Sequence, residues 1–455
     1  MIAFLFAACV SDAPFADTDP ATEPRTDPVT EPRTEAVTKA PETEPPETGP
    51  VEPYGDFDIV LGEPVVVFQG RENDQGWGKH QFPNLSVCAD GSLRIAWMYG
   101  EDKVGAVGNR RYIKMSLDGG VRWFFGDTGS VGVKEVNPLP TGKYFHGFKS
   151  YGTVRDVDYT GYEPLATWGA GGQSAVYYGP DLLGCDSAAE KHVFTTEVVL
   201  YDAETGKSET VPATVNWPHY PVAVYYGNVT YTVSGWFGLS GSNWVTAEDA
   251  IYTCIYARGL NSDAKTKEDA LLENYTTHSV YVFKSVDGIN WDYLSQITAD
   301  DLTGGTDGPC EPKMIRMRDG SFVMLFRTGS DDPMYYTRSE DMCKTWSKPV
   351  PFHEYGVLPQ LLTLDCGVTL STFGRPDLVM RYSFDPAGVE WEPAQQIPLT
   401  LNGREHMWGN SCCYTNLLPL SDTKALFIYS DFKYPNENGV GVRTILTREI
   451  TVVEK

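Results

Sequence analysis

The chain has 455 residues, of which 41% are hydrophobic and 13% aromatic, enough for a substantial core. Its formal net charge of −25 argues against nucleic-acid binding and against electrostatic attraction to anionic lipid. The 44 glycines and 31 prolines, together with few helix-like apolar stretches, favour many short strands joined by turns.

Residues 1–9 form a short apolar run that ends in Ala7-Ala8-Cys9. The run resembles a bacterial lipoprotein signal, in which the cysteine after two small residues is lipidated following export. The resemblance implies a lipid anchor on Cys9 as the only membrane contact, and a place on the surface of a bacterial cell. An ordinary secretory signal, which would leave the protein secreted, is the alternative.

Residues 10–55 form a Thr/Pro/Glu-rich segment in which "TEPRT" occurs twice. The segment holds almost no large apolar side chains, so burial cannot offset the entropy lost on ordering it. We therefore expect a disordered tether, stiffened by proline and extended by charge. The remaining residues, 56–455, are expected to form the folded domain.

A serine, an acid and a tryptophan recur at nearly constant spacing in four stretches. They read "SLDGGVRW" from Ser116, "SVDGINW" from Ser285, "SEDMCKTW" from Ser339 and "SFDPAGVEW" from Ser383. Strand patterns joined by tight turns precede them. We expect the aspartate to accept backbone N–H bonds across the turn, the serine to cap the same turn, and the tryptophan to pack between neighbouring sheets.

Such repeated strand units predict an all-β fold, namely a six-bladed β-propeller with Asp-box turns. The four boxes mark four blades, residues 140–210 supply another, and residues 414–453 the last. We expect residues 221–236 to give the first two strands of the Ser285 blade. The strand-like residues 58–68 are expected to complete the ring.

With four such boxes, residues 58–453 resemble the sialidase (neuraminidase) superfamily, and the residues that flank the boxes strengthen the resemblance. The stretch "CEPKMIRMRDGSFVMLFR" places Glu311 at the start of one strand and Arg327 at the end of the next. In "FGRPDLVMRYSFD", Arg375 lies eight residues before the box serine, as another arginine does in sialidases. The stretch "CCYTNLLPL" is similar to the family's "YSxL" at Tyr414.

The resemblance implies that Tyr414 is a nucleophile, that Glu311 is the base beside it, and that Arg327 and Arg375 bind a sugar carboxylate. A neutral tyrosine attacks without repelling the substrate's carboxylate, and arginine binds a planar carboxylate bidentately. The acid that protonates the leaving oxygen is expected in the loop "YGEDKVGAVGNRR", where we prefer Asp102 and keep its neighbour Glu101 as the alternative.

One position departs from the family pattern. Sialidases open their first blade with "FRIP", whose arginine completes a clamp of three, whereas this chain reads "QFPN". Gln81 is therefore expected to contact the substrate through hydrogen bonds alone, without a charge. Arg71, Arg110 and Arg111 are candidates to replace the missing charge in space.

The sequence thus predicts a surface-tethered, retaining exo-glycosidase of sialidase type, which is a monomer and cleaves terminal sialic acid or a related acidic sugar from glycans or glycoconjugates. Two alternatives stay open: a non-catalytic carbohydrate-binding propeller lipoprotein, and a propeller hydrolase for a neutral sugar. The chain has no HExxH, no CxxC and no phosphate-cradling glycine loop, so we expect no metal and no cofactor.

Overall fold

The computed structural model of the protein describes most of the chain from residue 57 onward. The described ranges are 57–88, 90–100, 110–126, 137–148, 153–155, 166–170, 173–178, 193–202, 204–216, 219–220, 222–226, 229–233, 244–257, 260–261, 278–305 and 307–455. Within these ranges the chain is all-β, as predicted, with 31 strands and two short 3-10 helices, Ala299–Asp301 and Arg404–His406. No described helix is long and apolar enough to cross a membrane.

Three antiparallel sheets each take four consecutive strands of the chain. The first contains β3 (Gln81–Val87), β4 (Leu93–Tyr99), β5 (Arg110–Ser116) and β6 (Phe124–Phe125). The second contains β21 (Cys310–Arg316), β22 (Phe322–Arg327), β23 (Met334–Ser339) and β24 (Val350–His353). The third contains β25 (Val357–Thr363), β26 (Thr369–Gly374), β27 (Leu378–Ser383) and β28 (Gln395–Ile397).

A five-stranded sheet joins the first described strands to the last ones. It contains β1 (Phe57–Leu61), β2 (Val65–Gln69), β29 (Asn416–Ser421), β30 (Lys424–Pro435) and β31 (Gly441–Glu454). Both β1 and β2 pair antiparallel with β31. Residues 58–68, which were expected to complete the ring, thus pair with the last strand of the chain.

The strands between the first and second sheets are arranged differently from the prediction. A seven-stranded sheet contains β7 (Tyr144–Phe148), β11 (Val193–Asp202), β12 (Lys207–Asn216), β16 (Trp244–Ala247), β17 (Ala250–Ala257), β19 (Ser279–Ser285) and β20 (Asn290–Ile297). Its two halves meet where β12 pairs parallel with β20. Residues 140–210 were expected to form a blade of their own. Instead, β7 and β11 belong to the same sheet as Ser285, and β8, β9 and β10 belong to another sheet.

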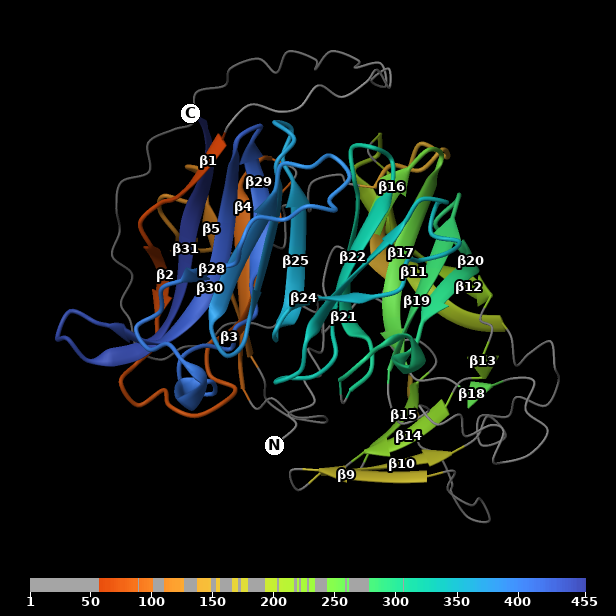
Figure 1. Ribbon diagram of the computed structural model, residues 1–455, viewed down its shortest axis with the longest axis horizontal. Helices are drawn as coiled ribbons and strands as arrows, with labels where there is room; N and C mark the ends of the chain where they lie inside the picture. The colour runs from red at the N-terminus through yellow and green to blue at the C-terminus, as the bar shows by residue number, and fades with distance from the viewer. Residues whose placement is uncertain are drawn as a thin grey trace.

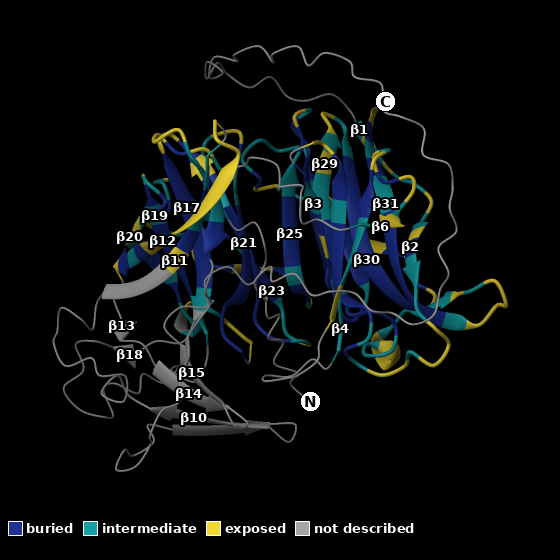
Figure 2. Cartoon of the chain, turned by 180° about the vertical axis from the view of Figure 1, so that it is seen from behind, coloured by how far each residue is buried: buried dark blue, intermediate teal, exposed yellow. Residues whose placement is uncertain are grey.

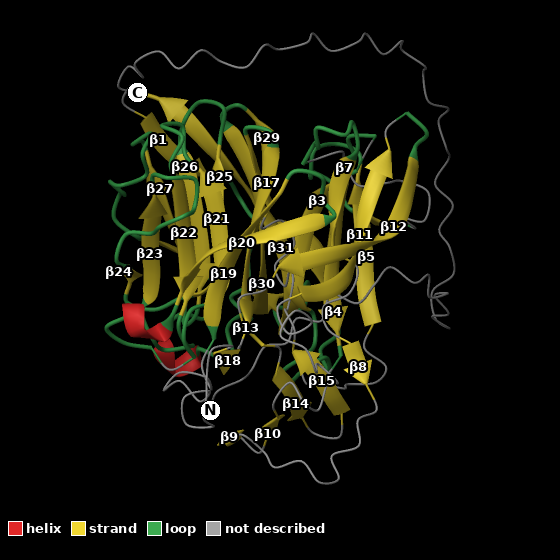
Figure 3. Cartoon of the chain, turned by 90° about the vertical axis from the view of Figure 1, so that its right-hand side faces the viewer, coloured by secondary structure: helices red, strands yellow, loops and turns green. Residues whose placement is uncertain are grey.

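The expectation for residues 221–236 is wrong. A separate sheet contains β8 (Thr153–Arg155), β9 (Ala166–Ala170), β10 (Gln173–Tyr178), β14 (Val222–Tyr226) and β15 (Val229–Val233), and β13 (His219–Tyr220) pairs with β18 (Leu260–Asn261). It is β16 and β17 that precede β19 in the Ser285 sheet. Alternating strand patterns specify which face is buried but not which strand is the neighbour. Figures 1 and 3 both show β9, β10, β14 and β15 at one end, below the main body.

One edge strand from each of four sheets lies next to an edge strand of another. Strand β3 contacts β29, β29 contacts β25, and β25 contacts β21. In Figure 1, β25 stands between the C-terminal sheet and the pair β21 and β22. The loops and strand ends of these four sheets are therefore brought together although they are far apart in the sequence.

Buried residues lie along the strands of the main body (Figure 2), and their apolar side chains form clusters that join neighbouring sheets. Trp97 of β4 packs in one cluster with Ile428 of β30 and Ile445 of β31, which joins the first sheet to the C-terminal one. A second cluster joins the C-terminal sheet to the β25–β28 sheet through residues such as Phe427 and Leu378. The sheets joined by these two clusters therefore depend on their neighbours for their cores.

The four box turns are built as predicted. In the turn that begins at Ser383, the Asp385 carboxylate accepts N–H bonds from Ala387, Val389 and Glu390 at 2.8–3.0 Å. Asp118, Asp287 and Asp341 accept backbone N–H bonds in the other three turns. The serines accept as well: the Gly288 N–H donates to Ser285 Oγ at 2.8 Å.

The box tryptophans Trp123, Trp346 and Trp391 lie between sheets, whereas Trp291 packs within the seven-stranded sheet. The indole N–H of Trp346 donates to Ser295 Oγ, a residue of the preceding sheet, at 3.0 Å. Trp123 packs against the cluster shared with β30 and β31. The repeat is therefore a structural device that holds a turn in place and connects neighbouring sheets.

Candidate functional site

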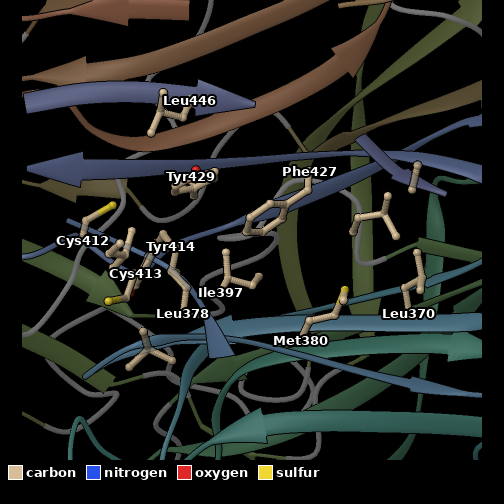
Figure 4. Close-up of a cluster of buried hydrophobic side chains, with 14 of the residues drawn as sticks. Leu370, Leu378, Met380, Ile397, Cys412, Cys413, Tyr414, Phe427, Tyr429 and Leu446 are labelled. Carbon is tan, nitrogen blue, oxygen red and sulfur yellow. The ribbon is translucent and has the colours of Figure 1, made fainter. Parts of the chain in front are cut away.

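Tyr414 lies just before β29, in a buried position beside the cluster shared by the C-terminal and β25–β28 sheets. Figure 4 shows it near Cys412, Cys413 and Leu378, at the end of the cluster opposite Leu370. The Tyr414 side chain is 2% exposed, and its hydroxyl donates a hydrogen bond to Oε1 of Glu311. The tyrosine and the glutamate, 103 residues apart in sequence, are thus in direct contact.

Glu311 is the second residue of β21 and is 4% exposed. Its Oε1 also accepts a hydrogen bond from Nη1 of Arg327 at 3.0 Å, and its Oε2 accepts the backbone N–H of Leu358 at 2.9 Å. Three donors from three sheets therefore orient the carboxylate.

A repeated backbone feature places these residues. At the start of β3, β21 and β25 the strand carries one residue more than its partner, which is a β-bulge. The bulged residues have a positive φ: 54° at Phe82, 47° at Glu311 and 40° at Leu358, each followed by proline. Cys413, with φ of 62°, precedes Tyr414 in the corresponding place before β29. The bulges turn side chains out of the regular strand alternation, toward the neighbouring sheets.

Arg327 ends β22 and is buried. Its Nη1 contacts Glu311, and its Nη2 lies 3.3 Å from Oδ2 of Asp307 and 3.1 Å from Oγ of Ser330. Burial opposes the charge of Arg327, but Glu311 and further negative neighbours outweigh it and raise the pKa of the guanidinium. Arg327 is therefore a fully charged residue with two carboxylate partners.

Arg375 follows β26 and is fully buried, but its surroundings differ. Its Nη1 donates to Ser330 Oγ and its Nη2 to the carbonyl of Cys412, both at 3.2 Å. The guanidinium lies 4.5 Å from the ring centroid of Trp408, and farther from the rings of Trp77 and Tyr414. Among the described residues no carboxylate forms an ion pair with Arg375.

The protonation states suit a neutral nucleophile. Burial, the charge of Glu311 and the hydrogen bond to it raise the pKa of Tyr414 well above that of an ordinary tyrosine. Burial and the like charge of Arg327 lower the pKa of Arg375. At neutral pH Tyr414 is therefore a neutral phenol, and it donates to Glu311, which is the arrangement needed for a base to take the phenol's proton during attack on a substrate.

Gln81 is buried at the start of β3. Its Oε1 accepts the backbone N–H of Gly78 at 3.0 Å, while its Nε2 has no hydrogen-bond partner within the described part of the chain. The next residue, Phe82, packs edge-on against Tyr414, with 5.1 Å between ring centroids. Arg71, Arg110 and Arg111 are exposed, so the structure does not bring them into this buried cluster.

The structure does not describe two of the predicted site residues, Asp102 and Cys9. Glu101, the alternative to Asp102, also lies outside the described residues. No group of three or more His, Cys, Asp or Glu side chains in the described ranges is arranged to hold a metal ion.

The structure adds four residues that the sequence analysis did not single out for the site: Asp307, Ser330, Trp77 and Trp408. Asp307 and Ser330 contact Arg327, and Ser330 contacts Arg375 as well. The two tryptophan rings meet edge-to-face at 5.2 Å beside Arg375. All four lie on loops, where no strand pattern indicates position. The available signals were short distances in the sequence, from Arg327 to Ser330 and from Trp408 to Tyr414.

Comparisons with known proteins concern mainly the fold. No family model matches the chain, and no curated protein matches it. A solved structure of a protein of unknown function from Dyadobacter fermentans superimposes with a TM-score of 0.50 at 15% identity, covering 87% of this chain and 99% of that one. At this identity the similarity shows a shared fold alone.

Two enzymes superimpose less well. An alpha-L-arabinanase of Penicillium chrysogenum complexed with arabinobiose has a TM-score of 0.42 at 12% identity, and covers 85% of this chain and 98% of that chain. The intramolecular trans-sialidase of Ruminococcus gnavus in complex with oseltamivir carboxylate has a TM-score of 0.41 at 14% identity, covering 85% and 96%. These TM-scores are too low to support an argument about this chain.

Proposed function

We propose that the chain is a retaining exo-glycosidase that uses Tyr414 as its nucleophile and cleaves a terminal sialic acid or a related acidic sugar from glycans. The contact between Tyr414 and Glu311 carries this proposal. A buried phenol that donates to a buried carboxylate, with two arginines alongside, has the parts that a tyrosine-based glycosidase requires.

In the proposed first step the Tyr414 oxygen attacks the anomeric carbon while Glu311 takes the phenol proton. The bond to the leaving oxygen breaks, and Asp102 protonates that oxygen. In the second step a water replaces Tyr414 on the anomeric carbon; Asp102 takes the water's proton, and Glu311 returns a proton to the phenolate. Two displacements at one carbon restore the original anomeric configuration.

The balance of hydrogen-bond donors favours an acidic substrate. Arg375 has no carboxylate partner among the described residues, and the Nε atoms of Arg327 and Arg375 and the Nε2 of Gln81 lack acceptors there. Buried donors without partners are costly, so a ligand rich in acceptors would satisfy this cluster. A sugar carboxylate supplies both acceptors and the missing negative charge.

A hydrolase for a neutral sugar is the second candidate, and Arg327 favours it. This arginine already has two carboxylate partners, Glu311 and Asp307, and Gln81 adds no charge. By contrast, a purely carbohydrate-binding protein would not need Tyr414 and Glu311 to face each other. Their contact disfavours that alternative.

The wider architecture in this proposal is a six-bladed propeller. The contacts of β3, β29, β25 and β21 in that order support four neighbouring blades. The two halves of the seven-stranded sheet would supply the remaining two. We further propose that the domain is monomeric and is held at the bacterial surface by a lipid on Cys9 and by the tether of residues 10–55, or is secreted.

Turnover by the full chain tests the proposal. We expect release of umbelliferone from its α-sialoside, with rates lowered at least about a thousandfold by Tyr414→Phe and strongly by Glu311→Gln. Tyr252→Phe is the matched control, because this buried tyrosine of β17 lies in another sheet and should retain full activity.

The outcomes separate the candidates. Wild-type activity on neutral aryl glycosides, but not on the sialoside, would replace the acidic sugar by a neutral one. Full activity of Tyr414→Phe on the preferred substrate would overturn the role of Tyr414 as nucleophile.

A further inference from the structure

Ser330 lies where two guanidinium groups from neighbouring sheets meet. Its Oγ accepts a hydrogen bond from Nη2 of Arg327 at 3.1 Å and one from Nη1 of Arg375 at 3.2 Å. A hydroxyl has two lone pairs and one proton, so the two arginines use both of its acceptor positions. The Ser330 proton is therefore left to donate to a third group, away from both cations.

No described residue accepts that proton, since the only hydrogen bonds of the Ser330 hydroxyl are the two from the arginines. Ser330 is half-buried, whereas Arg327 and Arg375 are buried. The hydroxyl is thus the member of this group of three that is most accessible to an incoming ligand.

The electrostatics around Ser330 call for an anion. Arg327 is balanced by Glu311 and Asp307, but Arg375 has no carboxylate partner among the described residues, and both cations point at one neutral oxygen. Like charges held this close repel each other in a buried site. An anionic group beside Ser330 Oγ would receive its O–H and lie next to both guanidinium groups.

The loop that carries Ser330 is held in place. Thr328 Oγ1 donates to the carbonyl of Pro333 at 2.6 Å, which closes the loop on itself. Asp331 forms an ion pair of 3.1 Å with Arg404, on the segment that also carries Trp408. Since ordering such a loop on binding would cost affinity, a loop fixed in advance suits a binding residue.

We propose that Ser330 is an anion-binding residue: its hydroxyl aligns Arg327 and Arg375 and donates to the carboxylate of the ligand. The Ser330 hydroxyl is thereby a further neutral donor beside the two arginines, at a site to which Gln81 brings no charge. The inference rests on the proposed function in taking a carboxylated sugar as the ligand, and it names a residue that this function did not require.

Binding measured by calorimetry tests the inference without catalysis. The probes are N-acetylneuraminic acid and its methyl ester, titrated into the full-length wild type, Ser330→Ala and Ser330→Thr. We expect the wild type to prefer the acid, and Ser330→Ala to weaken acid binding by about ten- to a hundredfold, because a hydrogen bond to a charged group is lost. Ser330→Thr keeps the hydroxyl and should stay within a few-fold of the wild type.

The ester and a control serine distinguish the loss of a contact with the ligand's carboxylate from a general disturbance of the site. Ester binding should change little in Ser330→Ala. Ser347→Ala should leave both affinities unchanged, because the Ser347 hydroxyl accepts the N–H of Arg338, at the end of β23 that lies away from Ser330. Equal acid affinity in Ser330→Ala and the wild type, equal weakening of acid and ester, or no preference of the wild type for the acid would each overturn the inference.

Turnover of the umbelliferyl sialoside, measured in parallel, separates this inference from the proposed function. Acid binding that depends on Ser330, without turnover of any glycoside, would support the anion site and contradict the enzyme. Turnover that depends on Tyr414 but not on Ser330 would support the enzyme and contradict the anion site.

Discussion

Arg375 carries a charge inside the protein with no carboxylate of the described chain to balance it. It is held by the Ser330 hydroxyl, a backbone carbonyl and the aromatic rings of Trp408 and Trp77. Cation–π contacts and neutral acceptors offset only part of the cost of removing a guanidinium from water. Residues that lower stability in this way are typical of binding sites, where the ligand supplies what is missing.

This difference between the two arginines predicts opposite effects on stability. We expect Arg375→Met to leave the free energy of unfolding unchanged or to raise it by about 1–2 kcal/mol, because an unbalanced buried charge is replaced by an apolar side chain. Arg327→Met should lower it by about 3 kcal/mol, because the buried side chains of Glu311 and Asp307 would lose the cation that they share. Urea unfolding of both variants measures the two values.

Both substitutions should abolish discrimination in favour of the acidic sugar. If Arg375→Met proved as destabilising as Arg327→Met, the buried guanidinium would be a structural residue and would no longer indicate an anion site.

The raised pKa of Tyr414 predicts a pH effect. Folding favours the protonated phenol, so its contribution to stability is complete below the unfolded-state pKa of about 10 and is lost as the pH rises toward the higher folded-state pKa. Tyr414→Phe has no such proton. Thermal melts from about pH 8 to 11 should therefore show the Tm of the wild type falling relative to that of the variant above about pH 10. A constant difference in Tm would show that the phenol is not held in its neutral form.

The cluster on which the proposed function depends was largely within reach of the sequence, but its supporting residues were not. Tyr414, Glu311, Arg327 and Arg375 stand at fixed places relative to strand and box patterns, and the structure brings all four together. Ser330 and its companions on loops depend on how separate sheets meet, which no local pattern encodes.

Among the secondary-structure elements, the box turns are the most regular. Asp385 binds three backbone N–H groups of its own turn, whereas Glu390 in the same turn has an exposed side chain with no hydrogen bond among the described residues. The two acids therefore form a matched pair for substitution.

We expect Asp385→Ala to lower the free energy of unfolding by about 1–3 kcal/mol, because N–H groups of the turn lose their acceptor. Glu390→Ala should change it by less than about 0.5 kcal/mol. Chemical denaturation of the two variants provides the comparison. Equal effects would mean that the loss of a negative charge, and not the turn's hydrogen bonds, determines stability here.

Strand neighbours were harder to predict than strands. Residues 221–236 form two strands as expected, but β14 and β15 pair with β10 and β8, and β16 and β17 take their predicted place before Ser285. The pairing of β1 and β2 with β31 was predictable, because an otherwise incomplete sheet needs partners. In the middle of the chain, several strand patterns could have supplied the two strands before Ser285. A pattern of alternating residues does not indicate which of them pair.

For the whole molecule, the net charge of −25 bears on how an anionic substrate approaches. At an ionic strength of about 0.01 M the Debye length is about 30 Å, and long-range repulsion acts on the substrate; at about 0.15 M it is about 8 Å. Contacts within the buried arginine cluster are screened much less.

Salt should therefore raise kcat/KM for an acidic aryl glycoside by about two- to threefold between these ionic strengths, and should raise it more for a polyanionic glycan. A neutral glycoside turned over by the same enzyme should show no change. Steady-state kinetics at the two salt concentrations measure the effect; a fall in kcat/KM would show that local attraction by the arginines outweighs the charge of the whole molecule.

The central claim is that the fold brings Tyr414 and Glu311 together so that the tyrosine forms a covalent bond to the sugar. Mass spectrometry of a digest tests it most directly, after reaction of the full chain with a sialoside that carries fluorine beside the anomeric carbon and a good leaving group. Fluorine destabilises the oxocarbenium-like transition states, so the covalent intermediate accumulates. The account predicts one sugar adduct, located on Tyr414 and absent from Tyr414→Phe. An adduct on another residue, or turnover of the unfluorinated sialoside without any adduct and with inversion of the anomeric configuration, would contradict it.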